Sequence, residues 1–481
     1  MQEINHINRL RREVLKRVAG AFMASGNGES AVAAVERIPY EMRPKGGGHD
    51  RCCIYKDRAI LRYRCMAAMG FLLEDEDDDS TPLAKYAEKA AQRNGSEADF
   101  VISACDIACH SCINARFFVT NVCQGCVAHP CVGACRFGAV HIVNGRSQID
   151  VDKCRNCGKC LASCPYGAIV KLQVPCEHSC PVKAIKKSEH GRAEIDFNKC
   201  ISCGRCMRAC PFGAILERSS VTDVLLRLKN RHVTAMVAPA IIGQFGVPLG
   251  KIYSAMRQLG FSACMEVATG ADITSRREAD EFVERMHEGA RFMTTSCCPG
   301  YIQAVRKLMP EVRPFVSDTG TPMHYTAELA RQSNPETVTV FVGPCVAKRL
   351  EGLEDEMVDY VLTFEELGAL FEAAGIELEE CEEASLGEGA SGDGRKYAVS
   401  GGVAAAVVSC VGERAEVKPV QVDGLSLKGL KHLRDYATRE APGNLVEVMA
   451  CEGGCVGGSG VLGNSAKAGM AVEKFARESA E

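Results

Sequence analysis

The spacing of its cysteines constrains this chain more than any other feature. Of 481 residues, 28 are cysteine, and more than half of these lie between residues 105 and 210. Two segments, 154–165 and 200–211, repeat one pattern. Three cysteines are separated from one another by two residues, and after three more residues a Cys-Pro pair follows. In a chain with no secretory feature, so many closely spaced thiols indicate bound metal rather than disulfides.

The repeated pattern has the spacing of bacterial ferredoxins. In such a block, three thiolates on one loop hold three corners of a [4Fe-4S] cubane, and the fourth reaches the neighbouring cluster. Structural zinc is the main alternative, but zinc sites usually use two separated cysteine pairs. We therefore expect [4Fe-4S] clusters in this region.

A third block, at 123–135, has a slightly stretched spacing and is expected to pair with the block that begins at Cys154. One cluster would then be held by Cys123, Cys126, Cys131 and Cys164, and a second by Cys154, Cys157, Cys160 and Cys135. A truncated block would lend Cys180 to a third cluster with Cys200, Cys203 and Cys206. Cys176 and Cys210 are left over, so we predict three accessory clusters within a range of two to four.

Three further cysteines, Cys105, Cys109 and Cys112, have the spacing of radical-SAM enzymes. In those enzymes a (β/α) barrel follows the motif directly, whereas in this chain ferredoxin-type blocks follow it. Another cluster site, or ordinary buried thiols, are the favoured interpretations.

Composition limits the partners of this chain. With a formal net charge of -4 it lacks the basic field on which nucleic-acid affinity depends, so no nucleic-acid partner is expected. No stretch reaches the roughly 18 apolar residues of a membrane span, the best candidate being Val233 to Gly243. The first residues lack the apolar core of a signal peptide. We expect a cytoplasmic protein with no membrane partner.

Cysteine density divides the chain into residues 1–100, 101–219 and 220–481. The first region is predicted to be mainly helical, with an amphipathic helix from Ile4 to Phe22 and an acidic run at 74–79 that acts as a solvated linker. The second is predicted to be a ferredoxin-like α+β domain with several clusters.

The third region alternates short apolar runs with helical patterns, starting at residues 290, 337 and 396. This alternation predicts an α/β domain built of parallel βαβ units in two lobes. In such folds ligands lie at the carboxyl ends of the strands. Three segments at predicted strand ends supply thiols: Cys297, Cys298, Cys345, Cys451 and Cys455.

Taken in order behind the ferredoxin-type blocks, these three segments resemble the large-subunit domain of iron-only, or [FeFe], hydrogenases over nearly all of residues 220–481. The resemblance implies an H-cluster, which is a [4Fe-4S] cubane joined through a cysteine sulfur to a two-iron unit with CO, cyanide and a bridging dithiolate. The implied cubane ligands are Cys298, Cys345, Cys451 and Cys455, and Cys455 would also bridge to the two-iron unit.

The resemblance also implies a proton path. Cys297 would be the relay thiol, followed by the carboxyls of Glu278 and Glu281 and the hydroxyl of Ser317, and Lys348 would donate to a cyanide ligand. Without the family match, Glu281 and Arg285 would be read as a surface ion pair, and Lys348 as a surface lysine.

The implied function is the reversible reduction of protons to H2 under anaerobic conditions, with ferredoxin or a similar low-potential carrier as electron partner and maturation proteins that supply the two-iron unit. Two alternatives stay open. One is a non-catalytic relative similar to the cytosolic iron-sulfur assembly factor and prelamin-binding proteins, which lack the paired cysteine. The other is a hydrogen sensor of the same family. Departures at Gly343, Tyr301, Met323 and residues 456–460 resemble the divergent group B branch, and they leave direction, rate and oxygen sensitivity open.

Overall fold

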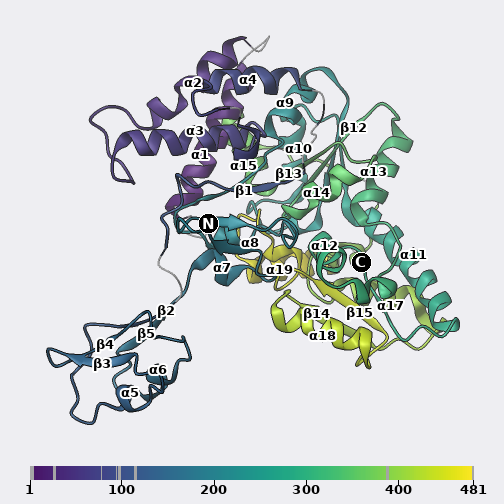
Figure 1. Ribbon diagram of the computed structural model, residues 1–481. Helices are drawn as coiled ribbons and strands as arrows, with labels where there is room; N and C mark the ends of the chain where they lie inside the picture. The colour runs from purple at the N-terminus through teal and green to yellow at the C-terminus, as the bar shows by residue number, and fades with distance from the viewer. Residues whose placement is uncertain are drawn as a thin grey trace.

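The computed structural model describes residues 5–24, 29–76, 78–93, 95, 99–112, 116–385 and 389–478. The N-terminal helices lie at the top of Figure 1 beside the large α/β part, and one small β unit stands apart at the lower left. Within the described ranges, every helix is too short or too polar to span a bilayer.

Helices make up most of the N-terminal region: α1 (His6–Ala24), α2 (Glu29–Met42), α3 (Ile54–Ala68), the 3-10 turn η1 (Leu73–Asp75) and α4 (Leu83–Gln92). On α1 the buried side chains recur at helical spacing, at Val14, Leu15, Val18, Ala19 and Phe22. This apolar face packs against α2, α3 and, from the third region, α15 (Phe364–Ala374). The predicted amphipathic helix is therefore present, although Ile4 lies outside the described residues.

The acidic run after α3 is only partly solvated where it is described: Glu74, Asp78 and Asp79 are exposed, but two other carboxylates pair with arginines. The carboxylate of Asp75 lies 2.8 Å from the guanidinium of Arg218, and that of Glu76 lies 2.6 Å from Arg62. Asp77 lies outside the described residues. The prediction of a solvated run fails for Asp75 and Glu76, because their cationic partners come from other segments, which the charge pattern of the run does not reveal.

The cysteine-rich region folds as two β units. The unit that stands apart in Figure 1 contains β2 (Arg116–Val119), α5 (Pro130–Gly133), β3 (Val140–Val143), β4 (Arg146–Ile149), α6 (Lys159–Ser163) and β5 (Ile169–Leu172). The other contains β1 (Ile102–Ala104), α7 (Pro175–Ser179), β6 (Ile185–Lys187), β7 (Ala193–Ile195), α8 (Arg205–Ala209) and β8 (Ile215–Glu217). In each unit the first strand pairs antiparallel with the last, and the two middle strands form a hairpin.

Two parallel sheets form the centre of the third region. One has the order β10 (Ala263–Glu266), β9 (Val233–Val237), β12 (Val338–Gly343) and β13 (Tyr360–Thr363). The other has the order β11 (Met293–Thr294), β15 (Leu445–Met449) and β14 (Pro419–Asp423). β9, β12 and β15 are buried along their whole length, which explains their mainly apolar sequences. The predicted parallel α/β architecture is confirmed.

Helices surround both sheets. They are α9 (Val221–Asn230), α10 (Leu249–Leu259), α11 (Val267–His287), α12 (Pro299–Leu308), α13 (Pro322–Ser333), α14 (Ala347–Glu354), α15, α16 (Gly392–Lys396), α17 (Gly402–Val411), α18 (Leu427–Thr438) and α19 (Ser465–Glu478). Short 3-10 turns are η2 (Pro239–Ile241), η3 (Pro310–Phe315), η4 (Leu378–Glu380), η5 (Gly412–Arg414) and η6 (Cys455–Gly457).

One expected strand, at 396–402, does not form. α16 ends at Lys396, and the chain turns tightly into α17 through Gly401, whose φ is +89°. A Cβ on Gly402 would lie 2.0 Å from the carbonyl oxygen of Lys396. The turn depends on these glycines. Tyr397 and Ala398, which follow α16, line a cavity instead of joining a sheet.

Candidate functional site

The three cysteine segments of the third region follow the carboxyl ends of buried strands, as predicted. Cys297 and Cys298 lie between β11 and α12, and Cys345 lies between β12 and α14. Cys451 follows β15, and Cys455 begins η6. Because β12 belongs to one sheet and the other two strands belong to the second, these loops converge on one space from both sheets.

The space between the loops is a cavity. All five predicted thiols line it: Cys297, Cys298, Cys345, Cys451 and Cys455. Lys348 also reaches it, and much of the remaining wall is apolar, including Val267, Met323 and Phe341. The structure therefore brings six sequence-predicted residues to one enclosed, mainly apolar site.

Burial sets the chemistry of these thiols. Burial, together with nearby cysteines, raises the pKa of Cys345 to about 11 and that of Cys455 to about 12. Several thiolates would lie together there with little water to stabilise them. Cationic iron removes that penalty, because metal binding favours the thiolate form. The backbone N–H of Ala450 already donates to the sulfur of Cys298 at 3.3 Å.

The loop from Cys451 to Cys455 requires a residue without a side chain at Gly454. Its φ is +90°, and a Cβ there would lie 2.6 Å from the backbone nitrogen of Ser400 and 2.8 Å from the carbonyl oxygen of Ala398. Only glycine tolerates both the dihedral and the approach. This packing fixes the path of the loop that carries two of the thiols.

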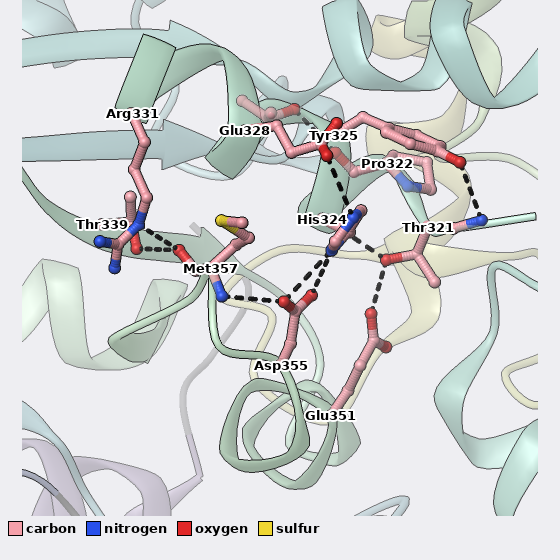
Figure 2. Close-up of polar contacts among 12 residues, drawn as sticks. Thr321, Pro322, His324, Tyr325, Glu328, Arg331, Thr339, Glu351, Asp355 and Met357 are labelled. Carbon is pink, nitrogen blue, oxygen red and sulfur yellow. Dashed lines mark hydrogen bonds and ion pairs between the residues drawn. The ribbon is translucent and has the colours of Figure 1, made fainter. Parts of the chain in front are cut away.

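Lys348 is buried, at 8% exposed, and its ammonium faces the cavity. Its Nζ lies 2.7 Å from Glu351 and 3.4 Å from the hydroxyl of Thr321. Figure 2 shows how this corner is braced: Thr321 donates to Glu351 at 2.6 Å, and His324 contacts Asp355 at 3.0 Å. Burial lowers the pKa of Lys348, but the Glu351 carboxylate more than offsets this, so the ammonium stays charged.

Loss of the Glu351 charge should destabilise the protein. Glu351→Gln leaves the Lys348 ammonium without its counter-charge in a site shielded from water, and we expect the free energy of unfolding to fall by about 2 kcal/mol. Urea denaturation of anaerobically prepared protein at neutral pH measures the change.

Glu354→Gln is the matched control, because Glu354 lies on the same helix but pairs with Arg306 at the surface, 2.5 Å away. Its cost should stay below about 0.5 kcal/mol. Equal losses in both variants would show that Lys348 does not depend on Glu351.

Glu278, on α11, is fully buried, at 0% exposed. The backbone N–H and the hydroxyl of Ser296 donate to its Oε1 at 3.0 and 3.1 Å, while its Oε2 has no hydrogen-bond partner among the described residues. Burial raises the pKa of Glu278 to about 7. Burial and then the nearby Glu278 carboxylate raise the pKa of the Cys297 thiol. A carboxyl that titrates near neutral pH thus lies beside the predicted relay thiol.

Glu281 lies one helical turn further along α11. The hydroxyl of Ser317 donates to it at 2.6 Å, and Arg285 lies 2.6 Å away, so the hydrogen bond of the predicted path and the ion pair are both present. Ser317 also faces Glu278, where its hydroxyl acts to lower the pKa of that carboxyl. Arg285 in turn contacts Asp318, whose side chain is 94% exposed. These groups form a line from the cavity to the surface.

Some accessory thiols lie next to this cavity. Cys180, Cys200, Cys203 and Cys206 lie close together, in the grouping that the spacing predicts. Burial raises the pKa of the last three thiols, and the nearby Cys180 raises each of these values as well. Cys203 also lines the cavity. Arg205 donates to the carbonyl oxygens of Leu425 and Ala450 at 2.8 Å each, which fixes this loop against the segment that leads to Cys451.

The remaining predicted ligands lie mainly in the separate β unit. Cys135, Cys154, Cys157 and Cys160 line one small pocket there, which matches one predicted set. Of the other set, Cys131 and Cys164 share the small apolar core of the unit, and Cys123 and Cys126 lie on the loop that precedes α5.

Two residues near the site were not predicted. Tyr397 lines the cavity, with its hydroxyl 2.7 Å from that of Ser275. Thr319 donates to Glu281 at 2.8 Å beside Ser317. Nothing in the sequence singles out Tyr397, which lies in the segment expected to be a strand. The Ser-Asp-Thr run at 317–319 offers a weak signal, since both hydroxyls can face one carboxylate.

Comparison with known proteins identifies the family. Residues 231–459 match the model described as iron only hydrogenase large subunit, C-terminal domain. Residues 170–221 match an LdpA Fe-S cluster-binding domain, and residues 147–169 a 4Fe-4S binding domain. The chain is 32% identical over 375 residues to the periplasmic [Fe] hydrogenase large subunit of Nitratidesulfovibrio vulgaris, covering 65% of this chain and 85% of that one. The chain belongs to the [FeFe]-hydrogenase family.

Other proteins match a smaller part of this [FeFe]-hydrogenase family member. Iron hydrogenase 1 of Clostridium pasteurianum is 30% identical over 292 residues, and the chain spans 51% of its length. The cytosolic Fe-S cluster assembly factor of Kluyveromyces lactis is 28% identical over 127 residues, or 25% of this chain and 27% of that one. A solved [FeFe]-hydrogenase from Chlamydomonas reinhardtii aligns with a TM-score of 0.44 and 22% identity over 53% of this chain and 88% of that one.

Proposed function

We propose that this chain is an active hydrogenase, which interconverts protons, electrons and H2 at an H-cluster held by Cys298, Cys345, Cys451 and Cys455. One observation carries the proposal: Cys297 lines the same cavity as these four thiols and lies beside the buried carboxyl of Glu278. An assembly factor that only holds a cubane has no need of a proton-carrying thiol in the same cavity.

The residues present fit such a cofactor. Four thiols from three loops face one apolar cavity, and burial keeps them protonated until a cation replaces the proton. Lys348 places a fixed positive charge at the wall, where it would offset an anionic group. When bound, the cluster supplies the redox-active iron at which protons and electrons combine.

The chain's own residues would handle the proton. The raised pKa keeps Cys297 a neutral thiol that has a proton to give, and Glu278, with a pKa of about 7, would resupply it. The hydroxyl of Ser317 faces both carboxyls and would pass the proton on to Glu281 near the surface. Proton transfer needs such a chain of titratable groups within hydrogen-bond reach.

Electrons would enter through the cysteine-rich region. Cys203 lines the cavity, so a cluster on the thiols of Cys180, Cys200, Cys203 and Cys206 would lie beside the catalytic centre. A ferredoxin is the proposed donor or acceptor, and dedicated maturation proteins would supply the two-iron unit. The proposed setting is an anaerobic cytoplasm, which the many unpaired thiols favour.

Anaerobic production with maturation proteins tests the function. The mature chain should show infrared bands of metal-bound CO and cyanide and should evolve H2 from a reduced viologen. The Cys298→Ala variant, which lacks one cubane ligand, should show neither. Matured protein with neither bands nor H2 would instead favour a role like that of the assembly-factor relative.

A further inference from the structure

The β unit that contains β1 and β8 has two halves with one plan. In the second half, β7 leads to a cysteine loop, α8, a Cys-Pro pair at Cys210 and then β8. The first half has the same order from β1 to β6, with α7 and a Cys-Pro pair at Cys180, but residues 113–173 are inserted into its cysteine loop. The insertion includes the whole of the separate β unit.

Hydrogen bonds match the two halves residue by residue. Cys200 N donates to Asp196 O at 2.9 Å, and Cys109 N donates to Cys105 O at 3.0 Å. Asp196 and Cys105 each follow the last residue of a strand. Their own backbone N–H groups each donate at 2.7 Å to a carbonyl that precedes the partner strand, on Ala184 and Ala214. Cys109 therefore occupies the position of Cys200, and Cys105 the position of the non-ligand Asp196.

Backbone dihedrals extend the match to Cys112. The residue before the second cysteine of a block has a left-handed φ, which is 54° at Ser202 and 51° at Asn156. Ser111, immediately before Cys112, has a φ of 51°. A non-glycine residue rarely adopts this conformation, and ordinary packing of buried thiols does not require it. The loop that carries Cys109 and Cys112 thus has the cluster-binding conformation.

The end of each block matches as well. Ala184 N donates to the sulfur of Cys180 at 3.2 Å, and Ala214 N donates to the sulfur of Cys210 at 3.4 Å. Cys176 on α7 takes the place of Cys206 on α8. Burial and then the nearby Cys210 raise the pKa of Cys176 to about 11, so these two thiols face the same place.

Side-chain contacts hold the segment with Cys109 and Cys112 against the segment with Cys210. The rings of His110 and Phe212 stack with centroids 4.4 Å apart. Arg51 donates to the carbonyl oxygens of Ala108, at 3.2 Å, and Phe212, at 2.8 Å. The arginine also adds positive charge beside the thiols, which would offset the negative charge of a cluster.

We propose that Cys109, Cys112, Cys176 and Cys210 hold a fourth accessory [4Fe-4S] cluster, in a ferredoxin fold whose first cysteine loop is interrupted by a second ferredoxin fold. Three thiols of one interrupted block and the last thiol of the other block supply one cluster in the ferredoxin arrangement. Cys105 is not a ligand. The assignment rests on this backbone match and does not depend on the hydrogen chemistry proposed above.

The site also has a place in the electron route. Both connections to the inserted unit start close to ligands of this cluster, at Cys112 and at Cys176. Cys176 on α7 serves this cluster, and Cys180, which directly follows α7, serves the cluster beside the cavity. The fourth cluster would therefore carry single electrons between the inserted unit and the catalytic domain.

Iron analysis tests the assignment on the full chain, produced anaerobically without maturation proteins. Five cubanes predict about twenty iron atoms per chain, and about sixteen would overturn the proposal. The double variant C109S/C112S should lose about four iron atoms and the matching share of the reduced-cluster spin signal. Retention of the parental iron content would also overturn it.

Cys105→Ala is the matched control, because Cys105 lies in the same segment and is at least as deeply buried as Cys109 and Cys112. It should keep the full iron content, and a loss equal to that of the double variant would overturn the ligand assignment. Circular dichroism shows whether each variant is folded. If the double variant does not fold, the iron content of the parent chain still decides the question.

Discussion

The Cys297→Ala variant should retain its infrared CO and cyanide bands and lose hydrogen evolution by about 10²–10⁴-fold, the usual contribution of a positioned proton donor. Cys297 lines the cavity beside Glu278, but the proposed cubane uses the four other thiols. Alanine removes the transferable proton and leaves the four ligands in place. Infrared spectroscopy and viologen-driven H2 evolution on the same anaerobic sample measure both effects.

Cys410→Ala is a suitable control, because this cysteine lies on α17 and does not line the cavity. It should leave turnover within about twofold of the parent, since it offers no group to the proposed reaction. Parental turnover in Cys297→Ala would remove Cys297 from the proton path. Loss of the bands in that variant would show instead that the thiol is needed to build the cofactor.

The thiol-lined cavity was partly predictable, because some of its determinants are local. β12 and β15 are mainly apolar, each is followed within a few residues by a thiol, and parallel strands of one sheet end at the same edge. Strand recognition and cysteine position together place Cys298 and Cys451 near each other, because β11 and β15 are parallel neighbours in one sheet. Cys345 follows β12 of the other sheet, and its approach to them depends on how the two sheets pack, which one sequence does not reveal.

Features that depend on distant partners were not predictable from one sequence. The acidic run pairs with arginines that include Arg218, more than a hundred residues away. Cys109 and Cys112 resembled an isolated motif because the residues that complete their block, Cys176 and Cys180, follow a long insertion. Only the pairing of β1 with β8 shows that they belong to one fold.

Glu278→Gln should lower hydrogen evolution without removing the cofactor. An amide cannot pass on a proton, so we expect hydrogen evolution to fall by about 10²-fold or more with the infrared bands retained. Glutamine keeps the size of the side chain and can still accept from Ser296, which now donates to Glu278 at 3.0 Å. Parental turnover in this variant would exclude Glu278 from the path.

The same variant should change how stability depends on pH. Burial raises the pKa of Glu278 from 4.5 to about 7, so the folded state keeps a proton that the unfolded state releases as pH rises through 4.5. The free energy of unfolding therefore falls with rising pH until about 7, by about 3 kcal/mol in all. Glu278→Gln lacks this loss, and between pH 5.5 and 8 its stability relative to the parent should rise by about 2 kcal/mol.

Glu281→Gln, one turn away on α11, should show the opposite effect on the pH dependence of stability. Burial acts to raise the pKa of Glu281, but hydrogen bonds from Ser317, Asp318 and Thr319 together with Arg285 give a net lowering. Its carboxylate therefore stabilises the fold above pH 4.5, and that stability is lost only as pH falls below this value. Urea denaturation should show a constant deficit for Glu281→Gln between pH 5.5 and 8, against a rising advantage for Glu278→Gln. Parallel curves for the two variants would mean that Glu278 is ionised in the folded protein and cannot hold the proton that the path requires.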